Sequence, residues 1–465
     1  MTRNAHYGSL LDVAQRLHSK ELSPVELTEH MLKRISAKDK RLKSYATVTA
    51  DLATKQAKKA EKEILRGHIR GPLHGVPIAV KDLCYTKGIT TAAGMAIHKK
   101  FRPKFNATVV KRFADAGAVL LGKLQMTEGA FADHHPDVTP PVNPWNRDHW
   151  SGASSSGSGV ATAAGLCFAS LGSDTGGSIR FPSAANGVTG LKPTWGRVSR
   201  HGVFDLAPTL DHVGPMCRSA ADTGAVLGVI AGADTNDPTA SPVPVPNYLA
   251  GLERGLTGLR IGVDPKYNRR GVDDTMITAV KSALAVLRGI GADVREVTFP
   301  NTDEVVDEWS AHCGIETAYA HRDTYPKQKD RYGPALSGLI DLGHSLSATD
   351  YQKILLHRHD FCGNVRALFE DIDILVIPAQ SAASPTLKQM ETLGEDPKAL
   401  SSLLRFTAPF DLTGSPALTM PAGLTKAGLP VAIQFVGRHF EEDALVRAGH
   451  AYQLETDWHH QHPAI

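Results

Sequence analysis

A stretch of small residues at positions 150–199 constrains this chain more than any other feature of its sequence. Residues 151–159 read SGASSSGSG, and after an alanine-rich run residues 173–178 read SDTGGS. Glycine lets a backbone turn sharply and brings its N–H groups close to a ligand. Several N–H groups that face one point can bind an anion or stabilise a developing oxyanion. The stretch therefore predicts an anion-binding or acyl-transfer loop that ends on a serine able to attack the bound group.

Other interpretations of a glycine- and serine-rich loop have to be weighed against acyl transfer. A flexible linker is the commonest, but linkers rarely alternate with alanine-rich helical and apolar segments as this stretch does. A phosphate-binding loop would show G-x-x-x-x-G-K-[ST], or G-x-G-x-x-G after a strand, and the stretch contains neither. The G-x-S-x-G nucleophile elbow does not occur in it either. The residues alone leave anion binding and acyl transfer open.

Several separated segments resemble the amidase signature family. GASSSGSGVATAAGL at residues 152–166, followed by LGSDTGGSIRFPSAANGVTGLKPTWGRVS at 171–199, closely resembles the family's signature. Upstream, GPLHGVPIAVKD at 71–82 resembles its lysine strand, and downstream LDHVGPMCRSAAD and LPVAIQFVG resemble later family segments. The resemblance extends from about residue 10 to about residue 452, in the family's order.

The resemblance implies a hydrolase with a Ser–cis-Ser–Lys triad. Ser178 is then the nucleophile, Ser154 relays the proton after a cis peptide bond, and Lys81 is the terminal base. Physical reasoning from the sequence does not choose Ser154 over Ser155 or Ser156; alignment to the family does. The N–H groups that the resemblance assigns to an oxyanion hole belong to Thr175, Gly176, Gly177 and Ser178.

Lys81 has to be neutral to act as a base. Desolvation at the end of the apolar strand expected at residues 76–80 would lower its pKa, because burial disfavours the charged form. The alternative for an isolated lysine is an ion pair with the neighbouring Asp82, and the apolar run together with the resemblance favours the base. Asp174 and Arg180, on either side of the second loop, are expected to form a buried pair that braces it.

Strands alternating with helices predict an α/β fold. We expect short apolar strands at residues 76–80, 118–121, 259–263, 294–299, 372–377, 417–420 and 431–435, and helices around 24–35, 51–65, 106–113 and 443–454. The prediction is a mixed, largely parallel β-sheet covered by α-helices, with Lys81 beyond the carboxyl end of its strand. One domain, residues 1–465, would comprise an N-terminal helical region (8–70), the signature core (71–220) and a helical substrate-pocket region (300–370).

Composition excludes several classes of partner. The 51 basic and 48 acidic residues nearly balance, and without a long basic block we expect no nucleic acid partner. No apolar run has the length of a membrane span, and the N-terminal residues do not resemble a signal peptide, so a cytoplasmic protein is expected. Five widely spaced cysteines form no disulfide framework or C-x-x-C pattern, and the histidines lack H-E-x-x-H spacing. We therefore expect no metal and no cofactor.

The substrate is the least constrained part of the prediction. A competing function is the glutaminase subunit of a tRNA amidotransferase, which uses an acid and an arginine to bind glutamine; the matching positions here, near 337–338 and 403–404, are neutral, although Arg405 lies nearby. A catalytically degenerate scaffold is the third alternative. We favour an amide hydrolase for small uncharged, apolar or aromatic substrates, with anilides, esters and carbamates as further candidates, and leave a homodimer open. Candidate pocket walls are Met126, Phe131, Trp309, Tyr319 and Phe406.

Overall fold

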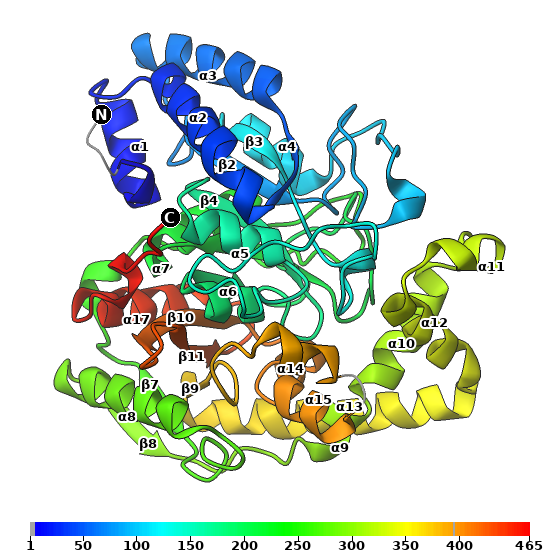
Figure 1. The fold of residues 1–465 in the computed structure, drawn as a ribbon. Coiled ribbons are helices and arrows are strands. Elements are labelled where there is room, and N and C mark those ends of the chain that lie inside the picture. The colour runs from blue at the N-terminus through cyan, green and yellow to red at the C-terminus, as the bar shows by residue number, and fades with distance from the viewer. Residues whose placement is uncertain (1–4, 394–395) are drawn as a thin grey trace.

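The computed structural model describes residues 5–393 and 396–465 and contains one continuous sheet of eleven strands (Figure 1). The strands are β1 (Tyr45–Val48), β2 (Pro77–Lys81), β3 (Val119–Leu124), β4 (Ala169–Asp174), β5 (Thr189–Lys192), β6 (His212–Cys217), β7 (Arg260–Val263), β8 (Asp293–Glu296), β9 (Ile374–Pro378), β10 (Ala417–Leu424) and β11 (Pro430–Gly437).

The α-helices flank this sheet. They are α1 (Leu10–His18), α2 (Pro24–Leu42), α3 (Ala50–Leu65), α4 (Thr108–Asp115), α5 (Ser156–Ala163), α6 (Arg180–Asn186), α7 (Ala220–Ile230), α8 (Asp274–Gly289), α9 (Asp303–Asp307), α10 (Trp309–Ala320), α11 (Tyr325–Gln328), α12 (Pro334–Ser345), α13 (Ala348–Asp371), α14 (Leu387–Glu391), α15 (Pro397–Leu404), α16 (Ala408–Leu412) and α17 (Glu442–Leu454). None of these helices is both long and apolar enough for a membrane span.

The predicted α/β class and the mixed sheet are confirmed. The strand order is β1-β3-β2-β4-β6-β5-β10-β11-β9-β7-β8. Parallel pairing joins β3, β2 and β4 in one flank and β9, β7 and β8 in the other. The central strands from β4 to β9 pair antiparallel. One reason is that a short turn joins β10 to β11, and such a turn can only join antiparallel neighbours. Parallel pairing is thus a property of the flanks.

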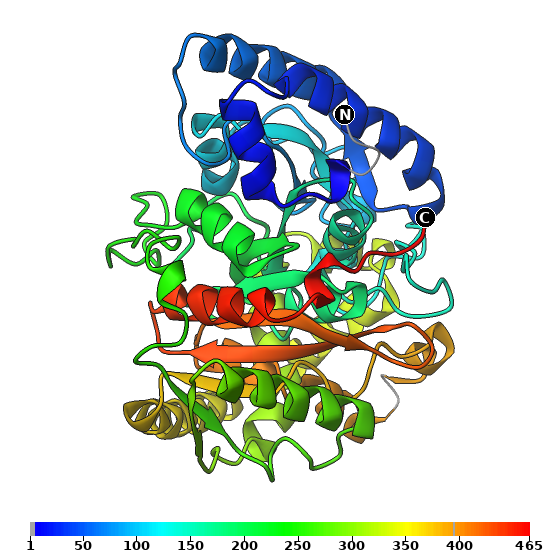
Figure 2. The ribbon, with the colours of Figure 1, turned by 90° about the vertical axis from the view of Figure 1, so that its left-hand side faces the viewer.

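Helices cover both sides of the sheet. Helices α5 and α6 pack together against the central strands, while α7, α17 and α8 pack on the other side (Figures 1 and 2). The helices α1, α2 and α3 lie at one end of the molecule, and α8, α9 and α13 at the other (Figure 1). Beside the sheet, the chain from α9 to α13 is helical, as the sequence predicts for residues 300–370.

A local signal explains the start of α2 but not that of α4. Ser23 caps α2 by accepting hydrogen bonds from the N–H groups of Val25 and Glu26, as its sequence predicts. Asn106 lies just before α4 but does not cap it: α4 has Ala107 at its N-cap, and the Asn106 side chain accepts a hydrogen bond from the Lys87 N–H. The asparagine stabilises the preceding loop instead.

The parallel arrangement of β2 and β4 creates the site described below. The two strands are neighbours, so their carboxyl ends lie at the same edge of the sheet. Lys81 is the last residue of β2 and Asp174 the last of β4. Both are fully buried. The edge predicted for Lys81 is therefore the edge at which the second glycine loop begins.

Candidate active site

Lys81 and Ser154 are in direct contact. The Lys81 Nζ lies 2.6 Å from Ser154 Oγ and 2.8 Å from Ser173 Oγ, and both serines are buried. The peptide bond between Ala153 and Ser154 is cis. The Ser155 N–H donates to the Ser178 carbonyl oxygen at 3.3 Å, so the two serine loops are joined by their backbones.

The neighbouring serines are engaged elsewhere. Ser155 Oγ donates to the Ser173 carbonyl oxygen and accepts from the Ser173 N–H, both at 3.2 Å. Ser156 Oγ lies 3.0 Å from His134 Nε2. Among the three consecutive serines, Ser154 is thus the one whose hydroxyl meets the lysine. The sequence alone left this choice open, because three identical side chains carry no signal of their direction.

Burial favours the neutral form of Lys81. Desolvation lowers its pKa to about 7, although the negative charge of Asp174 opposes this shift. Asp82, the expected ion-pair partner in the alternative interpretation, lies 3.1 Å from Lys123 instead. A neutral lysine amine keeps a lone pair, so it can accept a proton from a serine hydroxyl. The geometry and the electrostatics of this corner suit proton removal.

A buried carboxylate holds the second loop. Asp174 accepts hydrogen bonds from the N–H groups of Gly177 at 2.6 Å and Ile179 at 2.9 Å. Its other partner is the Arg180 guanidinium, which also binds Asp411 at 2.6 Å. Burial would raise the pKa of Asp174, but the charge of Arg180 outweighs that effect and holds it well below its usual range. The expected bracing pair is present and extends to a third residue.

The loop leaves some N–H groups free for a ligand. Within residues 5–393 and 396–465, the N–H groups of Thr175, Gly176 and Ser178 have no acceptor. The Gly177 N–H differs from its three neighbours in the expected set, because it donates to Asp174. Three of the four N–H groups expected in an oxyanion hole therefore remain available, and that of Gly177 is not among them.

An apolar cavity of about 100 Å³ lies beside Ser178. Phe131 and Trp309, two of the predicted wall residues, line it. The rest of its lining is Ala130, Ala132, Trp150, Ala153, Thr175, Gly176, Ser178, Phe181, Leu206, Ser310, Met390, Leu393, Leu400, Leu403 and Leu404. Among the described residues, no charged side chain contributes to this lining.

The other three predicted wall residues lie elsewhere. Met126 and Phe406 are fully buried in the hydrophobic core, where Phe406 packs edge-on against Tyr267 at 5.0 Å. Tyr319 is 65% exposed and lies under the Arg322 guanidinium. We therefore remove these three residues from the predicted cavity walls: Met126 and Phe406 pack in the hydrophobic core, and Tyr319 faces solvent.

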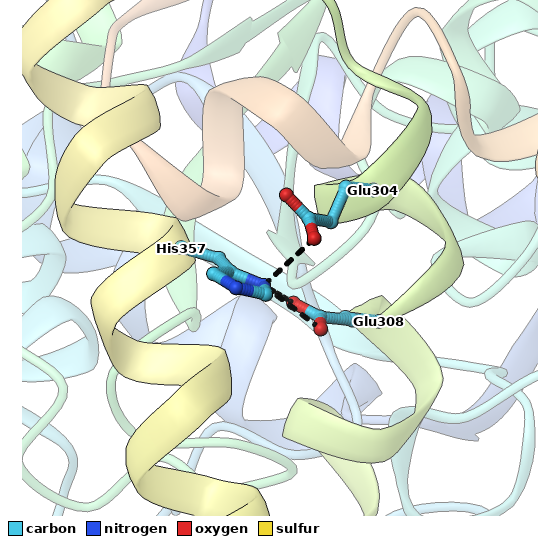
Figure 3. Close-up of side chains that lie close together, drawn as sticks. All are labelled: Glu304, Glu308 and His357. Atoms are coloured by element: carbon cyan, nitrogen blue, oxygen red, sulfur yellow. Dashed lines mark hydrogen bonds and ion pairs between the residues drawn. The ribbon is translucent and has the colours of Figure 1, made fainter.

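One cluster of side chains has the composition of a metal site. Figure 3 shows Glu304, Glu308 and His357 pointing toward one another between α9 and α13. The His357 Nδ1 lies 3.2 Å from Glu304 and 3.0 Å from Glu308. These distances equally fit an imidazole shared by two carboxylates, and the Lys353 ammonium, 3.9 Å from Glu308, opposes a cation. We interpret the cluster as side-chain contacts between the imidazole and the two carboxylates, which join the two helices.

Comparisons with known proteins identify the family of this chain. The amidase family model matches residues 26–446. A solved structure, the peptide amidase of Stenotrophomonas maltophilia, has a TM-score of 0.81 and 30% identity to this chain, with 96% of each chain covered. The fold and these matches define a hydrolase that acts on amide bonds. The chain belongs to the amidase family, which its sequence segments resemble.

Two relatives of this chain carry different functional names. The protein named AmiD of Mycobacterium tuberculosis (strain ATCC 25618 / H37Rv) is 50% identical over 457 residues, which cover 98% of this chain and 96% of the relative. A glutamyl-tRNA(Gln) amidotransferase subunit of Geobacter sp. (strain M21) is 38% identical over 478 residues, which cover 96% of this chain and 97% of the relative. The identity is thus higher to AmiD than to the amidotransferase subunit.

Proposed function

We propose that this chain hydrolyses small amides through an acyl-enzyme on Ser178, with Ser154 as proton relay and Lys81 as terminal base. The observation that carries the proposal is the buried contact of 2.6 Å between Lys81 Nζ and Ser154 Oγ. A serine hydroxyl is a weak nucleophile unless a base removes its proton as it attacks. A lysine whose pKa is about 7 can do so at neutral pH.

The reaction has two halves. Ser178 Oγ attacks the amide carbonyl carbon, its proton moves to Ser154, and the proton of Ser154 moves to Lys81. The carbonyl oxygen becomes an oxyanion, which the N–H groups of Gly176 and Ser178 stabilise. When the C–N bond breaks, the Lys81 proton returns through Ser154 to the departing amine. Water then attacks the carbonyl carbon of the Ser178 ester and gives its proton to Lys81 through Ser154. As the ester C–O bond breaks, the same relay returns this proton to Ser178 Oγ, and the carboxylic acid is released.

The cavity supports an uncharged substrate with a small apolar or aromatic group. Most of the described residues in its walls are apolar and none of them is charged, and removing a charged group from water into such a lining is costly. Arg405, the nearby arginine, does not line the cavity: its guanidinium donates to the carbonyl oxygens of Arg270 and Tyr267. The binding of a glutamine α-carboxylate by this arginine is therefore not supported. Anilides, esters and carbamates are further substrates to screen.

The decisive experiment combines labelling with a hydrolysis screen of the purified chain. A serine-directed fluorophosphonate should label Ser178, and a panel of amides with varied acyl and amine groups should show turnover of uncharged members. A glutaminase subunit would instead need its partner subunits and would favour glutamine. A degenerate scaffold would show neither labelling nor turnover. Either result would refute the proposal.

A further inference from the structure

We propose that Trp309 and Thr407 are positioning residues for the loop at residues 175–178, whose free N–H groups would stabilise the oxyanion. Their side chains hold carbonyl oxygens of this loop and thereby orient its N–H groups. The inference deepens the proposed acyl-transfer function and rests on it. The Trp309 Nε1 donates a hydrogen bond of 3.0 Å to the Thr175 carbonyl oxygen. The Thr407 Oγ1 donates a hydrogen bond of 2.6 Å to the Gly176 carbonyl oxygen. These two donors bind the carbonyl oxygens of consecutive peptide groups in the loop that leads to Ser178.

The direction of each peptide follows from these bonds. In a trans peptide the C=O and the N–H point in opposite directions. Because the Thr175 carbonyl points to Trp309, the Gly176 N–H points away from the indole. The Gly176 carbonyl points to Thr407, and the Gly177 N–H on the far side donates to Asp174 at 2.6 Å. The peptide between Gly176 and Gly177 is therefore fixed at both ends.

The next peptide completes the arrangement. The Gly177 carbonyl oxygen accepts a hydrogen bond of 2.6 Å from the Phe181 N–H, which opens the turn into α6. The N–H of the same peptide, that of Ser178, has no acceptor in the part of the chain that the structure describes. The free N–H groups of Gly176 and Ser178 are thus each opposite a carbonyl that is held by the protein. Such fixed donors are what a developing oxyanion requires.

The bonds of Trp309 and Thr407 add to the support from Asp174, because the two consecutive glycines have no side chains of their own to fix their backbone. Two consecutive glycines allow many backbone conformations, and Gly177 has φ +138°. A Cβ added to Gly176 would lie 2.5 Å from the Trp309 ring, so the indole packs directly on this backbone. Trp309 and Thr407 are themselves buried, at 6% and 0% exposure. Trp309 also lines the cavity, so one indole is both a substrate wall and a support for the loop.

The test removes each donor with a limited change of side-chain shape. Trp309→Phe keeps an aromatic wall without the N–H, and Thr407→Val removes the hydroxyl at nearly constant volume. Each should lower kcat for an amide by about tenfold to a hundredfold, less than the 10²–10³ typical of deleting an oxyanion donor itself. Thr407→Ser keeps the hydroxyl and should restore most of the rate. Trp150→Phe shortens another indole of the cavity, for which no hydrogen bond to the loop exists among the described residues, and serves as the matched control.

The affinities for two inhibitors separate a change in the orientation of the N–H groups from a general loss of binding. An aldehyde analogue of the best substrate forms an oxyanion on Ser178, whereas the matching alcohol binds without forming one. In Trp309→Phe and Thr407→Val, affinity for the aldehyde should fall by the same factor as kcat/KM, while affinity for the alcohol should change less than about threefold. In Trp150→Phe the affinities for the aldehyde and for the alcohol should change by the same factor.

Two outcomes would overturn the inference. One is a kcat within twofold of wild type in both folded variants, and the other is an equal loss of aldehyde and alcohol binding. Because the two donors belong to separate segments, either variant suffices if the other fails to fold. Failure of the proposed function looks different: the wild-type protein itself would not be labelled at Ser178 by a fluorophosphonate.

Discussion

The Lys81 side chain gives the sharpest prediction of pH dependence. Activity requires the neutral amine, so kcat/KM should be lost as the pH falls through about 7 and should level off above it. At pH 7 about half of the enzyme then carries a neutral base, roughly a thousandfold more than a solvated lysine with a pKa near 10.4 would supply. At pH 5 only about 1% of the activity should remain.

Two variants of Lys81 test its role as the base. Lys81→Ala should cut amide hydrolysis by about 10²–10⁴-fold, the usual contribution of a general base. Lys81→Arg should not restore the rate, because a guanidinium does not lose its proton in a protein. An activated ester should suffer less in both variants, because its leaving group needs no proton.

The assay is a pH profile of kcat/KM for wild type and both variants on a matched amide and ester. Lys123 provides the control: it is a second fully buried lysine, paired with Asp82 at 3.1 Å. Lys123→Met should lower the thermal stability, because it leaves a buried carboxylate unpaired, and should leave the pH midpoint in place. Full activity in Lys81→Arg, or an unchanged alkaline rise in Lys81→Ala, would refute the reasoning.

Further predictions concern the nucleophile, the intermediate, the cavity and the braced loop. Ser178→Ala should abolish turnover without changing the melting temperature by more than a few degrees; near-normal activity would mean another nucleophile. Hydroxylamine should convert the acyl-enzyme to a hydroxamate, and its absence with a good substrate would indicate direct attack by water. Leu403→Lys should raise KM for apolar amides through a charge in the cavity, as initial rates would reveal. Arg180→Met should destabilise the fold by about 3–5 kcal/mol in denaturant titrations, because two buried carboxylates lose their partner.

The position of Lys81 could be predicted because its signal is local. The apolar run before it forms β2, which is buried at every residue. A buried parallel strand places its last side chain at the carboxyl edge of the sheet, where β4 also ends. The strands β4 and β5 in the glycine-rich stretch, and β6 after it, were not predicted. They are also buried at every residue, but glycine and polar residues interrupt them, so they form neither an apolar run nor a regular alternation.

The cavity walls were predicted less well, because they come from distant helices. Trp309 and Tyr319 both belong to α10, and the sequence treats them alike. Their separation of ten residues corresponds to about 2.8 helical turns, so the two rings leave the helix in different directions. One reaches the loop of Ser178 and the other reaches solvent. No pattern in the chain marks which face of α10 meets the loop of Ser178.

The antiparallel centre of the sheet also bears on how the protein is synthesised. β5 pairs with β10 and β9 pairs with β11, so the two flanks are joined through the hairpin at residues 417–437. A nascent chain must keep the edges of β5 and β9 unpaired until that hairpin leaves the ribosome, and exposed strand edges recruit other chains. Premature termination before residue 417 should therefore yield chains that chaperones retain or proteases remove, even though Lys81, Ser154 and Ser178 are all made in the first half.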